Sequence, residues 1–335
     1  MGVLRGHRRC HRGWPVLQAL AQFWVSKASP DPNGCYDINT VQPPADLQGP
    51  AMTAAIHSID ASALNAPGCS AYTYLLRRYE PFLRGPDDQF AETRGGNNTG
   101  FNFLTGVGGF LQVFDYGYSG LRFTPNATEL DPSLSPQLHG ITLNDLRWQG
   151  RLFTVTIGLR STQVRLTSGS ALPVQTPAGL MTVAPGQSIT IPTRRPDLQS
   201  TTDLARCQQV TASSRVPGDD PVAAVDGSTA APWQATGAQA TVTMRLARKT
   251  AIDSVTVTRG STGSFGCNVE TSADGSVWHV VATAQATSTG TDQFTFTPAQ
   301  AQFVRLDFPG GTDASTPDTD EPLGERSVMP AAGQA

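Results

Sequence analysis

The feature that most constrains the fold is a change of hydrophobic pattern after Pro136. Downstream, short runs such as RLFTVTIGL, TQVRLTS and LMTVAPGQSITIP alternate apolar and polar residues, and glycine or proline separates the runs. Alternation with a period of two is typical of antiparallel strands that bury one face. The sequence therefore predicts β-sandwiches over most of the chain beyond this point.

Upstream of Pro136 the pattern is helical. Residues 15–28 begin with a proline and space their apolar side chains along one helix face. The run FLTGVGGFLQVFDYGYSGLRF predicts a second helix, which ends near Gly117 and Gly120. Residues 29–70 show too little periodicity for a firm prediction. The fold class is therefore mainly β, with an α-helical N-terminal part.

Changes in composition divide the chain further. The segment TRRPDLQSTTD, residues 193–203, is a polar linker between two β-rich blocks. The last segment lacks apolar periodicity, which predicts disorder. We therefore expect four parts: a helical part at 1–135, a small β-sandwich at 136–196, a second β-sandwich at 205–309 and a disordered tail at 310–335.

Charge and hydropathy exclude some functions. Of the 335 residues 15% are charged and the net charge is -3, so no basic surface for nucleic acid is expected. No apolar run approaches the roughly 18 residues that span a bilayer. The basic start MGVLRGHRRCHRG lacks the apolar segment of a signal peptide, so no signal peptide is visible in this chain.

The five cysteines form no CxxC pair, which argues against structural zinc. Because the count is odd, at least one thiol stays unpaired. Low lysine content, 25 prolines and 33 glycines resemble the composition of secreted polysaccharide-active proteins. On that composition we expect a secreted or cell-surface protein.

Residues 79–123 resemble the end of the catalytic barrel of glycoside hydrolase family 65, in its acid trehalase branch. The family's QFSEQ-like, FxFLTGxGGFLQ and GxxGLR phrases correspond to residues 89–93, 101–112 and 117–122. The block LRWQGRLFTVTIGLRSTQVRLTS looks like the small β-sandwich that closes the family's catalytic unit. The resemblance implies a partial (α/α)6 barrel end and inverting hydrolysis of α-glucosides such as trehalose.

The resemblance implies a general base at Glu92. Inverting hydrolysis uses one carboxylic acid to protonate the leaving oxygen and one carboxylate to activate water. Glu92 suits the second role, with Gln89 and Arg94 as neighbouring ligands for sugar hydroxyls. The alternative is a surface glutamate in a glycine-rich loop.

The general acid departs from the family pattern. The family uses the glutamate of a PDE motif, whereas this chain has PAD, so Asp46 stands at the glutamate position. Its carboxyl is one methylene shorter, and a misplacement near 1 Å can cost about 100-fold in rate. Most of the family's barrel also has no counterpart here. We therefore expect a truncated, inactive trehalase-type chain that needs no cofactor for catalysis.

Residues 205–309 resemble a discoidin, or coagulation-factor type C, domain. The phrases AVDGSTAAPWQA, VTMRLARKTAIDSVTVT, CNVETSADGSVWHVVATA and FTFTPAQAQFVRLDF follow one another in the family's order. Sugar-binding members are family 32 carbohydrate-binding modules, which use loops at one end of a jelly roll. The resemblance implies a carbohydrate partner, with Arg259, Phe265 and Asn268 as candidate ligands. Alternatively, Phe265 only covers the sandwich end.

The same resemblance implies a structural calcium near the DGSTAAPW phrase. Asp226 and Ser228 offer oxygen ligands, and the alternative is a simple turn with Trp233 in the core. We expect core positions for Trp233 and Trp278. Discoidin-type domains often join their two ends by a disulfide, but Cys267 is not near an end. We therefore expect no disulfide between Cys207 and Cys267.

Three functions follow as hypotheses. The first is a truncated trehalase-type glycosidase with a carbohydrate-binding module. The second is a non-catalytic carbohydrate-binding or cell-wall adhesion protein that acts through residues 205–309. The third is a purely structural fragment.

Overall fold

The computed structural model describes residues 28–30, 36–38, 51, 53–96, 102–229, 232–237, 239–259, 265–286, 290–309 and 323–330. The chain divides into two compact units, Met1–Gln48 and Gly49–Ala335. In the first unit, strands β1 (Ala28–Pro30) and β2 (Tyr36–Ile38) pair antiparallel. The helix predicted at 15–28 lies outside the described residues, apart from its last position, which belongs to β1.

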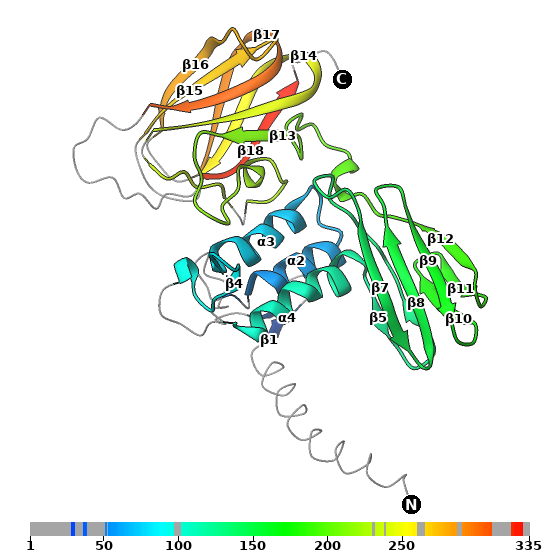
Figure 1. The fold of residues 1–335 in the computed structure, drawn as a ribbon. Helices are drawn as coiled ribbons and strands as arrows, with labels where there is room; N and C mark the ends of the chain where they lie inside the picture. The colour runs from blue at the N-terminus through cyan, green and yellow to red at the C-terminus, as the bar shows by residue number, and fades with distance from the viewer. Residues whose placement is uncertain are drawn as a thin grey trace, which may run out of the picture. The chain divides into compact units, whose positions relative to one another are not determined.

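Three helices open the second unit (Figure 1): α2 (Thr53–Ala63), α3 (Ser70–Tyr79) and α4 (Leu104–Gln112). A π-helical turn, Val113–Tyr118, continues α4. The helical run therefore ends beside Gly117 and Gly120, as the sequence predicted. Helix α2 lies in the stretch that allowed no firm prediction.

The end of α3 follows from its sequence. Arg77 and Arg78 lie in its last turn, where positive charge is favourable to the helix dipole. Pro81 follows and cannot continue the α-helical hydrogen bonding, so the chain turns through a 3₁₀ segment, Glu80–Phe82. A short hairpin comes next, formed by β3 (Leu83–Arg84) and β4 (Gln89–Phe90).

The first β-sandwich has two four-stranded sheets. One sheet has the order β12 (Ser188–Pro192), β9 (Ser161–Ser168), β8 (Arg151–Ile157) and β7 (Ile141–Trp148). The other has the order β11 (Gly179–Val183), β10 (Leu172–Thr176), β6 (Thr128–Glu129) and β5 (Arg122–Phe123). Along β9, Thr162, Val164 and Leu166 are buried while Gln163 and Arg165 are exposed. This is the alternation that predicted the strands.

The first β-sandwich begins before the boundary expected at residue 135. Strand β6 pairs parallel with β10, with Thr128 opposite Val174, and β5 pairs with β6. Because β5 and β6 have two residues each, they are too short to show an alternating pattern. The sandwich core also continues into the helices, where Leu75 and Val113 belong to the same buried cluster.

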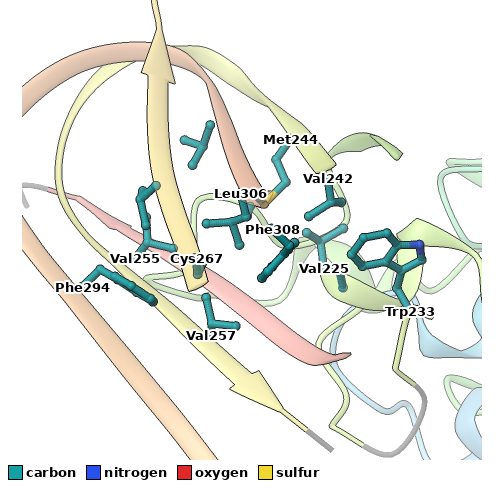
Figure 2. Packing of buried hydrophobic residues seen from close by; sticks show 14 of the residues in the cluster. Val225, Trp233, Val242, Met244, Val255, Val257, Cys267, Phe294, Leu306 and Phe308 are labelled. Atoms are coloured by element: carbon teal, nitrogen blue, oxygen red, sulfur yellow. The ribbon is translucent and has the colours of Figure 1, made fainter. Parts of the chain in front are cut away.

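The second β-sandwich is built around a long two-stranded ribbon. The strands of this sandwich include β13 (Gln209–Ala212), β14 (Ala240–Arg259), β15 (Phe265–Ser272), β16 (His279–Ala286) and β17 (Gly290–Phe308). The ribbon consists of β14 and β17. Strands β14 and β17 pair along almost their whole length, with register shifts after Arg245 and Ile252. Figure 2 shows Met244 from one half of β14 and Val257 from the other half in a single buried cluster. The ribbon therefore contributes to both faces of one core.

Of the tail for which disorder was expected, residues 310–335, the structure describes only residues 323–330. Residues Leu323–Pro330 form β18, which pairs antiparallel with the second half of β14. Strand pairing uses backbone N–H and C=O groups, so an edge strand can add to a sheet without a strong apolar pattern. The absence of apolar periodicity therefore did not mean disorder for residues 323–330.

The fold class is the one predicted: mostly β, with a few helices before the strands. Within the described residues, no helix combines the length and the apolar character that crossing a membrane requires.

Candidate functional site

Backbone hydrogen bonds on two sides hold the turn that carries Glu92. The amide of Ala91 donates to the carbonyl of Phe82 at 2.8 Å, and the amide of Ala51 donates to the carbonyl of Glu92 at 2.9 Å. The side chain of Glu92 is half-buried. A carboxylate on a fixed turn with partial access to solvent suits a group that acts on a water molecule.

The other predicted glycosidase residues lie in different surroundings. Gln89 lies in β4, opposite Arg84 of β3, and is half-buried three residues before Glu92. Asp46, the expected general acid, lies outside the described residues. The structure therefore brings Gln89 and Glu92 onto one hairpin and turn, and it does not place the acid.

Arg94 contacts the second β-sandwich. Its Nη2 atom lies 3.7 Å from the Oδ1 atom of Asp219 and donates to the carbonyl of Pro217 at 3.4 Å. Both partners belong to the loop between β13 and β14. The predicted sugar ligand is thus part of a contact between the Glu92 turn and the second β-sandwich.

A buried ion pair lies at the centre of this contact. Nη2 of Arg77, on α3, is 2.8 Å from Oδ1 of Asp219, and the two side chains are 6% and 5% exposed. Burial raises the pKa of Asp219 and lowers the pKa of Arg77, and in each case the partner's charge opposes the shift. Truncating either residue would leave the other charge buried and uncompensated, which is strongly destabilising.

A second group of contacts lies beside this pair. Glu80 pairs with Arg215, whose Nη2 is 3.2 Å from Oε1, and the amide of Gly218 donates to Oε2 at 3.1 Å. Gly218 has a φ of +85°, and a Cβ there would lie 2.5 Å from Cγ of Pro81. Only glycine therefore lets the loop approach the end of α3 this closely.

A disulfide joins the same two parts of the chain. Cys69, which precedes α3, is bonded to Cys207, 138 positions later, and the amide of Cys69 donates to the carbonyl of Asp226 at 2.7 Å. Cys267 lies buried as a thiol. The expected absence of a bond between Cys207 and Cys267 is confirmed. Sequence reasoning missed the pairing with Cys69 because it considered bonds only within the second β-sandwich.

Arg78 is a further buried charge that sequence reasoning missed. Its guanidinium donates to the carbonyl of Gly106 and lies 4.9 Å from the centre of the Phe90 ring. Burial lowers the pKa of Arg78 to about 10. A Cβ at Gly109 would lie 3.3 Å from Nη2 of Arg78, so the absence of a side chain at Gly109 makes room for the guanidinium. A glycine inside a predicted helix, such as Gly109, was the only local signal in the sequence for this contact.

The candidate sugar ligands of the second β-sandwich fall into two places. Arg259 ends β14 and Phe265 begins β15, so they flank residues 260–264, which lie outside the described residues. Asn268 lies further along β15. Its Nδ2 donates to Oδ2 of Asp307 at 3.1 Å, and its Oδ1 accepts from the hydroxyl of Thr283 at 3.0 Å. The amide of Asn268 therefore bridges the neighbouring strands β17 and β16.

The candidate calcium ligands form a hydrogen-bonded turn. Asp226 is fully buried, and its Oδ1 accepts from the amide of Ser228 at 2.8 Å. Its backbone carbonyl accepts from the amide of Cys69. Among the described residues, no group of three or more His, Cys, Asp or Glu side chains is arranged to hold a metal ion. Calcium also takes hydroxyl and backbone carbonyl oxygens as ligands, so a structural calcium at Asp226 and Ser228 stays a prediction.

Trp233 and Trp278 differ in how deeply their side chains are buried. Trp233 is completely buried, as expected, and its indole N–H donates to the carbonyl of Ser214 at 3.1 Å. Trp278 is only partly buried, and the guanidinium of Arg305 lies 4.1 Å from its ring centre. Trp278 precedes β16, an edge strand, so one side of the ring has no further strand to cover it.

Loss of the disulfide should destabilise the chain. Replacing Cys69 by Ala releases the 138-residue loop in the unfolded state, and the free energy of unfolding should fall by about 2–4 kcal/mol. Urea unfolding measures the change, and non-reducing peptide mapping should find the fragments with Cys69 and Cys207 linked. Cys207→Ala should lower stability equally, and the double variant should be no worse. Additive losses, or a map that links other cysteines, would contradict the assignment.

In a comparison with known protein families, one family model matches each of the two β-sandwiches. The model described as glycosyl hydrolase family 65, C-terminal domain matches residues 121–183, and the F5/8 type C domain model matches residues 209–318. The first match starts one residue before β5, in agreement with the structural start of the first β-sandwich. The second match starts at the first residue of β13.

Relatives extend the similarity beyond these two matches. The chain is 34% identical over 242 residues to the cell wall acid trehalase of Arthroderma benhamiae, covering 64% of this chain and 23% of that protein. It is 33% identical over 254 residues to the acid trehalase of Emericella nidulans, covering 68% and 23%. The chain thus spans less than a quarter of the length of these relatives.

Among solved structures, chitosan-binding module 1 from the chitosanase/glucanase of Paenibacillus sp. IK-5 is similar at 22% identity. The TM-score is 0.33, and the match covers 38% of this chain and 99% of that chain. The family matches show that this chain carries a glycosyl hydrolase family 65 C-terminal domain followed by an F5/8 type C domain, and that it is related to acid trehalases.

Proposed function

We propose that this chain is a trehalase-type protein that binds carbohydrate through its F5/8 type C domain and does not turn over trehalose by itself. The observation that carries the proposal is the contrast between the two functional regions. The F5/8 type C domain has a hydrophobic core of its own, with Trp233, Met244 and Leu306 fully or almost fully buried. The glycosidase region carries the turn of Glu92, and at the acid position its sequence has an aspartate in place of the family's glutamate.

Inverting hydrolysis needs two carboxyl groups about 6.5–9.5 Å apart, with a water molecule between one of them and the sugar. Glu92 supplies the base in this proposal. At the acid position the chain has the shorter Asp46, preceded by Ala45 in place of the family's aspartate. An acid displaced by about 1 Å loses about 100-fold in rate. We expect the shorter side chain of Asp46 and the loss of the neighbouring aspartate at Ala45 to lower turnover.

Carbohydrate binding belongs to the F5/8 type C domain in this proposal. The ligand contacts the loop between Arg259 and Phe265, where the aromatic ring stacks on a sugar face and the arginine donates hydrogen bonds. Affinity is weak, because a shallow site buries little area and must still offset the immobilisation of the ligand. The Cys69–Cys207 disulfide supports a secreted or cell-surface location, since such bonds persist in oxidising compartments.

The first test is a glucose-release assay on trehalose with the purified chain. We expect no turnover above a blank. Clear turnover would contradict the proposed inactivity, and Glu92→Gln would then show whether Glu92 is the base. An amide cannot accept the proton of the attacking water, so that variant should abolish any turnover. An unchanged rate would exclude Glu92 from the mechanism.

The second test is calorimetric titration with trehalose, other glucosides, galactosides and cell-wall polysaccharide. We expect binding to at least one glycan, and Phe265→Ala should weaken it about tenfold or more, the order of one lost stacking contact of 1–3 kcal/mol. Phe123→Ala is the matched control, because Phe123 is a 45% exposed aromatic residue on β5, outside the F5/8 type C domain. An equal loss of glycan affinity in both variants would exclude a binding site at the loop between Arg259 and Phe265. Absence of binding to every glycan would exclude the function.

A further inference from the structure

We propose that Asp219 of the F5/8 type C domain is a positioning residue for Glu92 and that it acts through Arg94. The proposal rests on the function proposed for Glu92. It assigns the F5/8 type C domain a second task, which is to fix the turn that carries the glycosidase carboxylate. Asp219 itself does not touch the sugar.

The contact is built directly onto the Glu92 turn. Arg94 follows Glu92 by two residues, and its Nη2 atom lies near both the carboxylate of Asp219 and the carbonyl of Pro217. The loop backbone lies against the same group, since a Cβ at Gly218 would be 3.3 Å from Nη2 of Arg94. The loop therefore limits where the Arg94 side chain can go.

Asp219 can act as a fixed point because α3 holds it independently of Arg94. Its ion pair with Arg77 is short and almost completely buried. Interactions between charges are stronger in such surroundings than in water, so Asp219 does not follow the movements of a half-buried neighbour. On the opposite side, the amide of Ala51 holds the carbonyl of Glu92. The Glu92 turn is thus fastened at both ends.

The chemical consequence concerns geometry. A carboxylate that activates water must stay within about 0.5 Å of its working position. If Arg94 is released, the segment from Glu92 to Gly96 loses its contact with Asp219 and Pro217 of the F5/8 type C domain. The F5/8 type C domain then no longer supports the carboxylate.

Amide hydrogen exchange tests the proposal without any substrate. Asp219→Asn keeps the shape of the side chain and removes its charge, so residues 92–96 should exchange about tenfold faster than in the parent chain. Asp220→Asn is the matched control. Asp220 lies 3.4 Å from Arg215 and caps the next turn through the amide of Val222, and asparagine can keep that cap. The control should leave exchange at 92–96 unchanged.

Substitutions at Arg94 separate positioning from a general loss of structure. Arg94→Gln should reproduce the faster exchange, and Arg94→Lys, which keeps the charge, should restore protection. If Asp219→Asn does not fold, the comparison of Arg94→Gln with Arg94→Lys decides alone. Unchanged exchange in Asp219→Asn or Arg94→Gln, or equal acceleration in Asp220→Asn, would overturn the proposal. Glu92→Gln should not alter exchange, so the glucose-release and glycan-binding assays judge the proposed function separately.

Discussion

The buried ion pair between Arg77 and Asp219 is the contact on which the arrangement of the second unit depends. Taking two charges out of water costs several kcal/mol per ion, and only a close and well-placed partner offsets that cost. A shifted docking of the F5/8 type C domain would leave both charges buried and separated. In our account the pair therefore disfavours shifted arrangements, because separating the two charges leaves each one buried without its partner. The Glu80 contacts and the Cys69–Cys207 bond lie around it and restrict the same movement.

This arrangement gives the F5/8 type C domain a fixed position, unlike a module on a flexible linker. The loop around Gly218 lies against the end of α3 and against Arg94, next to the turn of Glu92. A small apolar cluster of Cys69, Leu76 and Val222 adds to the contact. In our account the F5/8 type C domain supports the turn of Glu92 with the loop between β13 and β14. It binds carbohydrate with the loop near Phe265.

Strand-rich regions could be predicted from the sequence because alternation directly reflects one-sided burial, as β9 shows. Trp233 was placed in the core for the same kind of reason. Strands β5, β6 and β18 could not be predicted, since two residues carry no period and edge pairing depends on backbone groups. The roles of Arg94, Asp219 and Cys69 also escaped the sequence. They depend on contacts between residues more than 120 positions apart, and no local pattern encodes such contacts. The acid and base positions came only from the family resemblance.

The most direct test of the central claim is differential scanning calorimetry of a variant without the disulfide, Cys69→Ala with Cys207→Ala. If the ion pair and its neighbouring contacts hold the helices and the F5/8 type C domain together, one transition should appear, with equal calorimetric and van't Hoff enthalpies. Adding Arg77→Met alone, which leaves the Asp219 carboxylate buried without its partner, should split it into two. Two separate transitions in the disulfide-free variant, with Arg77 and Asp219 intact, would contradict the account.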